Sequence, residues 1–266
     1  MSRSIPYFMV CLIVLISVAA VPSLAAIKKE VVQYSLGDER FEGYLAYDDA
    51  IKAKRPAILV VHEWWGLNDY VKRRTEQLAG LGYIAFAADI YGNGIVTKDQ
   101  AVAAKLASVF WSGKDRNLLR SHVNAGLQIL ANHPLTDRKK IAAIGYCFGG
   151  MTVLELARSG ADVAGVVSFH GALATPNPED ARNIKGKVLV LHGADDPHVP
   201  IAQVTAFQDE MRRAKVDWQM IFYGGAVHSF TNPDAGSDPS RGVAYNEKAD
   251  RRSWEHMMLF FAELFK

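Results

Sequence analysis

Short apolar runs alternate along the chain with longer amphipathic segments. Eight of the runs are expected to form β-strands, at residues 30–34, 41–47, 56–61, 84–88, 140–144, 163–169, 187–191 and 218–223. From residue 56 onward the runs are continuously apolar, which indicates strands buried on both faces of a parallel sheet. The first two runs flank a Leu-Gly-Asp turn, so we expect them to pair as an antiparallel hairpin at a sheet edge.

Helical periodicity fills the gaps between these runs. We expect helices near residues 69–81, 98–110, 115–131, 148–158 and 201–213, and a last helix at the end of the chain. The last helix carries an apolar stripe that is expected to pack on the sheet, made of Trp254, Met257, Met258, Phe261, Leu264 and Phe265. Since no linker or repeat divides residues 26–266, the alternation predicts one α/β domain with a mostly parallel central sheet and helices on both faces.

The first 25 residues have the features of a targeting segment. Arg3 precedes an apolar run over residues 7–21, and Ser23 and Ala25 follow it as small residues two positions apart. This pattern is typical of a cleavable secretory signal peptide, so we expect residues 1–25 to be removed and the protein to be periplasmic or secreted. The alternative is a retained membrane anchor, although the run is shorter than the ~20 residues that span a bilayer comfortably.

Charge and cysteine content narrow the function. The 30 basic and 28 acidic residues nearly cancel, which argues against a nucleic-acid partner or an anionic membrane surface. Signal cleavage would remove Cys11 and leave Cys147 as the one cysteine. Cys147 is then either a buried apolar residue of the core or a free thiol with a function. Neither the cysteines nor the histidines have metal-site spacing, and we expect no metal and no cofactor.

The segment Gly145-Tyr146-Cys147-Phe148-Gly149-Gly150 joins a predicted strand to a predicted helix. It matches the G-x-S-x-G nucleophile elbow with cysteine in place of serine. Glycines on both sides permit the sharp turn, and the helix N-terminus favours the thiolate. The segment therefore predicts that Cys147 is a nucleophile.

An acid and a histidine follow in the order that this fold requires. Asp196 lies in the loop after the strand at 187–191, and His228 lies in the loop after the next strand. His228 would take the thiol proton and return it to the leaving group, while Asp196 would fix the tautomer of the imidazole. Asp195 competes for the acid role; we favour Asp196 because Pro197 and a Val-Pro pair follow it.

The loop after the strand at 56–61 supplies further candidates. The backbone N–H groups of Trp64 and Phe148 are expected to form an oxyanion hole. Glu63 places a carboxylate beside the thiol, where it could hold the thiol proton at rest. Trp65 and Tyr91 are candidates for lining an apolar substrate pocket.

Other residues have two interpretations. His170 follows a strand directly and is either a pocket residue or a packed one. The run Lys72-Arg73-Arg74 is expected to be a solvated helix face, and His122 is expected to be solvated or to cap a helix.

Together the cysteine elbow, Glu63, Gly-Ala-Asp-Asp-Pro-His-Val-Pro at 193–200 and His-Ser-Phe at 228–230 resemble the dienelactone hydrolase family. The resemblance covers nearly the whole chain after residue 26. It implies the α/β-hydrolase fold with a short N-terminal hairpin, a triad of Cys147, Asp196 and His228, and Glu63 as the resting partner of the thiol.

One departure from the family pattern concerns the substrate. Two arginines of the characterised lactone hydrolases correspond to Asn93 and Asn232 here, which removes the anchor for a substrate carboxylate. We therefore expect a monomeric hydrolase of small neutral esters or lactones. The alternatives are a thioesterase or general carboxylesterase, an exported cysteine peptidase, and a non-catalytic binding protein, which the complete triad disfavours.

Overall fold

The structure is a computed structural model that describes residues 1, 27–112 and 116–266. The expected signal peptide lies outside these residues except for Met1. Among the described residues, no helix has the length and hydrophobicity needed to cross a bilayer.

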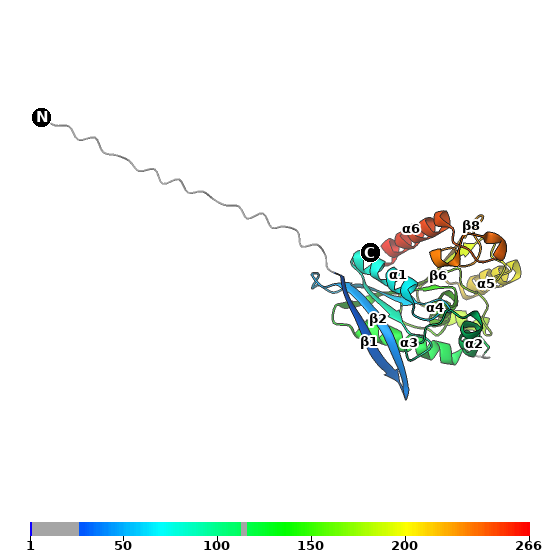
Figure 1. Cartoon of the computed structure of the whole chain (residues 1–266), viewed down its shortest axis with the longest axis horizontal. Coiled ribbons are helices and arrows are strands. Elements are labelled where there is room, and N and C mark those ends of the chain that lie inside the picture. Colours follow the sequence, from blue (N-terminus) through cyan, green and yellow to red (C-terminus); the bar gives the residue numbers. More distant parts are fainter. Residues whose placement is uncertain (2–26, 113–115) are drawn as a thin grey trace.

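Within the described ranges, one eight-stranded sheet forms the centre of the molecule (Figure 1). Its order is β1-β2-β4-β3-β5-β6-β7-β8. β1 pairs antiparallel with β2 at one edge, β2 pairs antiparallel with β4, and all later pairs are parallel, which confirms the predicted hairpin and sheet. The strands are β1 (Ile27–Leu36), β2 (Glu39–Asp48), β3 (Arg55–Val61), β4 (Ile84–Ala88), β5 (Thr136–Tyr146), β6 (Gly165–Phe169), β7 (Lys187–Gly193) and β8 (Trp218–Tyr223).

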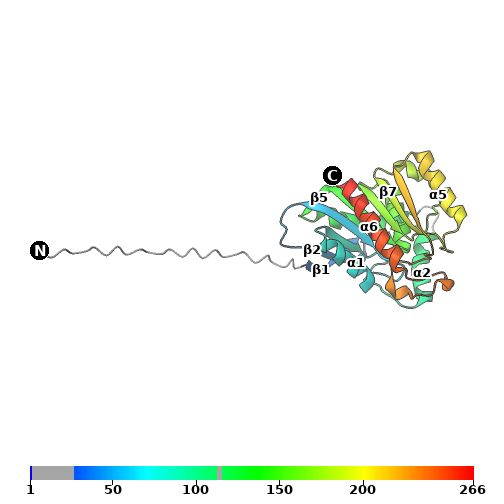
Figure 2. The same cartoon turned by 90° about the horizontal axis from the view of Figure 1, so that it is seen from above.

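Helices cover both faces of the sheet, as the continuous apolar strands predicted (Figure 2). Successive β3 residues alternate between two apolar cores: Leu59 packs in the core formed with α2 to α5, and Ile58 and Val60 pack in the core formed with α1 and α6. The helices are α1 (Asp69–Gly80), α2 (Gln100–Trp111), α3 (Asn117–Asn132), α4 (Phe148–Arg158), α5 (Ile201–Ala214) and α6 (Glu247–Leu264).

Two surface predictions are wrong. Arg74 is buried, because α1 packs against α6: its guanidinium pairs with Asp250 and lies 5.5 Å from the ring of Trp254. His122 is buried as well, since α3 turns it toward the sheet, where its Nδ1 lies 2.8 Å from the carbonyl oxygen of Ile90. The other two residues of the basic run, Lys72 and Arg73, are less buried.

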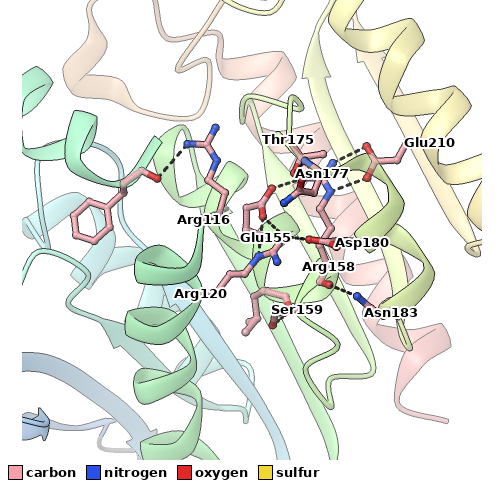
Figure 3. Close-up of polar contacts among 12 residues, drawn as sticks. Arg116, Arg120, Glu155, Arg158, Ser159, Thr175, Asn177, Asp180, Asn183 and Glu210 are labelled. Atoms are coloured by element: carbon pink, nitrogen blue, oxygen red, sulfur yellow. Dashed lines mark hydrogen bonds and ion pairs between the residues drawn. The ribbon is translucent and has the colours of Figure 1, made fainter. Parts of the chain in front are cut away.

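A buried network of ion pairs anchors α4, the helix that begins at the elbow (Figure 3). The Arg158 guanidinium is fully buried and donates to Glu155 at 3.0 Å and to both carboxylate oxygens of Glu210 at 2.7 and 2.9 Å. Arg120 from α3 joins Glu155 and also Asp180 in the 3₁₀ helix Pro178–Asn183. These contacts tie the C-terminal half of α4 to α3, to α5 and to this 3₁₀ helix. They thereby hold in place the helix whose N-terminus follows Cys147.

Candidate active site

The predicted site residues meet at one edge of the sheet. Glu63 follows β3, Cys147 follows β5, Asp196 follows β7 and His228 follows β8. The strands β3, β5, β7 and β8 run parallel to one another in the sheet, so their carboxyl ends lie along one edge.

Cys147 sits in a strained turn between β5 and α4. Its φ of 55° is rare for a residue with a side chain. A Cβ on Gly149 would lie 2.3 Å from the carbonyl oxygen of Val61, and a Cβ on Gly145 would lie 2.0 Å from that of Gly149. Only glycine fits at both positions, because the turn brings backbone against backbone.

The thiol, an imidazole and a carboxylate form a continuous chain of contacts. The Nε2 atom of His228 lies 3.1 Å from the Sγ of Cys147, and its Nδ1 atom lies 2.8 Å from the Oδ2 of Asp196. The other carboxylate oxygen of Asp196 accepts the backbone N–H of His198 at 2.8 Å. Asp195, the competing acid, instead accepts the backbone N–H of Gly225, so Asp196 is the carboxylate that meets the histidine.

The electrostatics favour a charged histidine. Burial by itself would lower the pKa of His228, but Cys147 and Asp196 together raise that pKa well above its usual range. Burial likewise opposes ionisation of Asp196, yet the hydrogen bond with His228 leaves the pKa of Asp196 below its ordinary value. The arrangement therefore suits a protonated His228 between the sulfur of Cys147 and the Asp196 carboxylate.

Glu63 is buried beside this chain, with 2% of its surface exposed. Its Oε2 accepts from the Nδ2 of Asn232 at 2.6 Å and its Oε1 accepts from the hydroxyl of Ser229 at 3.3 Å. Burial raises the pKa of Glu63 although both donors oppose that shift. Here the thiol faces His228, while Glu63 is held by these two neighbours.

Asn232 and Asn93, two of the expected substrate-pocket residues, have different surroundings. Asn232 is buried; its amide is engaged with Glu63, and its Oδ1 accepts the backbone N–H of Asp234. Asn93 is exposed in a turn with a φ of 54°, and its backbone N–H donates to the carbonyl oxygen of Arg40.

Aromatic side chains support the loop that follows β3. The hydroxyl of Tyr91 donates to the carbonyl oxygen of Trp64 at 2.9 Å, and the ring of Tyr91 packs 5.5 Å from that of Phe148. Trp65 packs edge-on against Trp64, with ring centroids 4.9 Å apart. His62 lies beneath this loop with its Nδ1 at 2.5 Å from the carbonyl oxygen of Glu63. Tyr91 thereby contacts both residues, Trp64 through its carbonyl oxygen and Phe148 through its ring.

His170 makes contacts with Cys147 and Thr231 that the sequence did not predict. His170 is fully buried, and its Nδ1 lies 3.1 Å from the backbone nitrogen of Cys147. Its Nε2 lies 2.7 Å from the Oγ1 of Thr231, which is also fully buried. The available signal was a histidine placed directly after β6, the strand that pairs with the elbow strand β5.

In the parts of the chain that the structure describes, no group of three or more His, Cys, Asp or Glu side chains could hold a metal ion. At the start of α4 the site brings a thiol, an imidazole and a carboxylate into contact.

Comparisons with known proteins place these motifs in a wider context. A sequence profile of the dienelactone hydrolase family matches residues 41–265. A solved dienelactone hydrolase-like promiscuous phosphotriesterase from metagenomic libraries is 44% identical and superposes with a TM-score of 0.86, over 91% of this chain and 100% of that one. An uncharacterised protein of Caenorhabditis elegans is 37% identical over 155 residues, which cover 57% of this chain and 98% of the relative. A dienelactone hydrolase of Anabaena variabilis, 20% identical with a TM-score of 0.61 over 87% of this chain and 98% of that one, shares the fold.

Proposed function

Because the chain belongs to the dienelactone hydrolase family and is therefore a hydrolase of the ester and lactone type, we propose that it uses Cys147, His228 and Asp196 as its triad. The observation that carries this proposal is the unbroken contact from Sγ through the imidazole to the Asp196 carboxylate, 3.1 Å and then 2.8 Å.

The proposed reaction proceeds through an acyl-enzyme. His228 holds the proton of the Cys147 thiol, and the thiolate attacks the substrate carbonyl to form a C–S bond. The backbone N–H groups of Trp64 and Phe148 stabilise the tetrahedral oxyanion. Collapse of the intermediate breaks the bond to the leaving alkoxide, which takes the proton from His228. Water, deprotonated by His228, then attacks the thioester and releases the carboxylic acid and the thiol.

Glu63 is proposed to act beside this triad as a second partner of the thiol. Its burial and raised pKa favour the protonated, neutral carboxyl group. A neutral carboxyl can remain near the thiolate without repelling it, whereas a fixed carboxylate there would oppose ionisation of Cys147.

The preferred substrate is proposed to be small and uncharged. Asn232 is committed to Glu63, and Asn93 is exposed, so neither position supplies the positive charge that a substrate carboxylate would need. Trp65 and Tyr91 are proposed to line the substrate pocket together with these two residues, which suits an apolar acyl group.

A second candidate activity is the hydrolysis of neutral phosphotriesters. It is favoured by the 44% identity to the promiscuous phosphotriesterase. A phosphotriester is uncharged, and the same thiolate could attack its phosphorus and displace one alkoxide or phenoxide group.

Location and assembly are further proposals. Residues 1–25 are proposed to direct export to the periplasm or outside the cell, and the mature protein is proposed to be a monomer. N-terminal sequencing of the protein from its native host tests the first point, since an intact Met1 would contradict cleavage. Light scattering of the purified protein tests the second.

The decisive experiment compares wild type and Cys147→Ala on p-nitrophenyl esters, thioesters, unsaturated lactones and a p-nitrophenyl dialkyl phosphate. We expect a burst of p-nitrophenol equal to the enzyme concentration from wild type and none from Cys147→Ala. Undiminished turnover in Cys147→Ala would overturn the triad, and faster hydrolysis of a carboxylated lactone than of neutral esters would overturn the substrate class. Binding without turnover of any substrate would favour the non-catalytic alternative.

A further inference from the structure

His170 makes a contact that the proposed mechanism does not use. The backbone N–H of Cys147 is shared between the carbonyl oxygen of Phe169, at 3.0 Å, and the Nδ1 of His170, at 3.1 Å. The nucleophile's own peptide group is therefore hydrogen-bonded to a side chain, in the strained turn where Cys147 has a φ of 55°.

The two ring nitrogens of His170 are assigned by their partners. Since Nδ1 accepts a hydrogen bond from an N–H group, the proton of a neutral ring lies on Nε2. Nε2 then donates to the hydroxyl oxygen of Thr231 at 2.7 Å. Burial first, and then the proximity of His228, lower the pKa of His170 well below its usual range, so the ring stays neutral.

Thr231, the partner of His170 Nε2, is itself held by hydrogen bonds. The Thr231 hydroxyl lies 2.7 Å from the hydroxyl of Tyr70, and the Thr231 carbonyl oxygen accepts from Arg74 at 2.8 Å. Arg74 in turn pairs with Asp250 of α6. His170 is thus held on one side by the nucleophile and on the other by the contact between α1 and α6.

Other titratable groups face the same ring. The imidazole of His228 lies edge-on to it at 5.4 Å between ring centroids, and the ring of Tyr146 lies at 6.2 Å. Arg74 and His192 are the remaining charged or titratable groups near enough to disfavour a second proton on His170. Phe230 packs against the ring at 5.1 Å. A cationic His170 would therefore be opposed by every one of these basic neighbours.

We propose that His170 is a positioning residue that fixes the peptide plane of Cys147. The orientation of this plane sets φ at Cys147, and through it the direction of Sγ and of the N–H of Phe148. This inference rests on the proposed function, because it assigns His170 a task in presenting that thiol and that oxyanion donor. His170 has a φ of 40°, a conformation that glycine adopts more easily, which is consistent with a side chain retained for its hydrogen bonds.

Three variants test the proposal. His170→Phe keeps the ring volume but removes both nitrogens, while His170→Asn restores an acceptor, Oδ1, at the position of Nδ1. His192→Phe is the matched control, because His192 is a buried histidine of the neighbouring strand β7 without a hydrogen bond to Cys147 among the contacts that the structure describes. The readouts are the rate constant for alkylation of Cys147 by iodoacetamide, the acylation rate and KM for a p-nitrophenyl ester, and the melting temperature.

In His170→Phe we expect acylation to slow by about 10- to 100-fold with little change in KM, since a misaligned nucleophile affects the reaction step more than binding. His170→Asn should recover most of the loss, and His192→Phe should remain near wild type. Equal impairment of the Phe and Asn variants would reduce His170 to a packing residue and overturn the proposal, as would a His170→Phe variant that is as fast as wild type.

A measurement on wild type keeps the proposal testable if His170→Phe does not fold. ¹⁵N NMR of the histidine-labelled protein should show an unprotonated Nδ1 and a protonated Nε2 for His170, and a proton on Nδ1 would refute the contact with Cys147. Neither NMR nor alkylation needs turnover. Retained turnover in Cys147→Ala would therefore overturn the proposed function alone and leave these two readouts to judge the position of the thiol.

Discussion

Replacing Glu63 by glutamine separates what this side chain contributes to the site from its effect on the fold. Only 2% of the surface of Glu63 is exposed, and its two hydrogen-bond donors, Asn232 and Ser229, are both neutral. Glutamine has the same shape. Its carbonyl oxygen can accept from Asn232, and its amide can donate to the Ser229 hydroxyl, so neither neighbour loses its partner.

The raised pKa of Glu63 determines whether Glu63→Gln raises or lowers the free energy of unfolding. Burial raises that pKa from an ordinary value of 4.5, so the folded protein binds this proton more tightly than the unfolded chain does. The resulting stabilisation is complete below pH 4.5 and is lost as the pH rises through the pKa of the folded state. At neutral pH the buried acid therefore lowers the free energy of unfolding of wild type, and Glu63→Gln does not have this cost.

The size of this change in stability follows from the balance of two opposing contributions, the cost of burying the carboxylate and the interactions that offset it. Burial of an ionised carboxylate costs several kcal/mol. Attraction by His228 offsets part of that cost, and a short hydrogen bond to a charged group offsets about 1.5–3 kcal/mol more. The bond from Asn232 is short, at 2.6 Å, and the one from Ser229 is long, at 3.3 Å. We expect Glu63→Gln to raise the free energy of unfolding at pH 8 by about 1–3 kcal/mol, which corresponds to a rise in melting temperature of about 3–10 °C.

Urea unfolding of wild type and Glu63→Gln at pH 4 and pH 8 measures the effect, and hydrolysis of a p-nitrophenyl ester measures the accompanying loss of activity. Glu76→Gln is the matched control: hydrogen bonds from Lys29 and Tyr44 outweigh burial and lower the pKa of Glu76, so its replacement should destabilise at pH 8 and not at low pH. A Glu63→Gln protein that is less stable than wild type at pH 8, or a difference that is the same at both pH values, would refute the reasoning.

Three other predictions follow from the network, the triad and the elbow. Arg158→Met leaves Glu210 buried without its partner and should lower the free energy of unfolding by about 3–5 kcal/mol in urea, whereas Arg182→Met, which breaks an exposed pair, should cost less than about 1 kcal/mol; equal losses would show that the buried network is not an anchor. Asp196→Asn should reduce kcat for ester hydrolysis by about 10³- to 10⁴-fold through the wrong tautomer of His228, while Asp195→Asn should have little effect; the reverse order would reassign the acid. Gly149→Ala should abolish soluble expression because its Cβ would lie 2.3 Å from a backbone oxygen, whereas Gly80→Ala, with open space around it, should stabilise by up to about 1 kcal/mol in thermal melts.

Local patterns in the sequence were sufficient for the architecture and for the candidate triad. The strands at 84–88 and 218–223 and the helix at 148–158 have the predicted bounds, because their apolar periodicity ends at clear turn residues. The elbow could be identified for the same reason: its two glycines and its cysteine all lie within one short turn.

Features that depend on distant parts of the chain could not be predicted. Arg74 looks like its neighbours Lys72 and Arg73, and only the arrival of α6, 176 residues later, buries it against Asp250. Asn232 and Glu63 are separated by 169 residues, and their hydrogen bond gives Asn232 a partner that its sequence neighbours do not reveal. Pairings of this kind arise from the packing of the whole fold and leave no local signal.

The separation of Cys147 and His228 along the chain also determines when the contact between these two residues can form. The cysteine leaves the ribosome 81 residues before its histidine, which corresponds to roughly 4–16 s at about 5–20 residues per second. Strands β3 and β5 and helix α4 are already available in this interval, so the turn can form, but its thiol has no imidazole beside it. Only after β8 joins the sheet does His228 reach the sulfur, so the contact between the thiol and the imidazole is among the last that the chain can form.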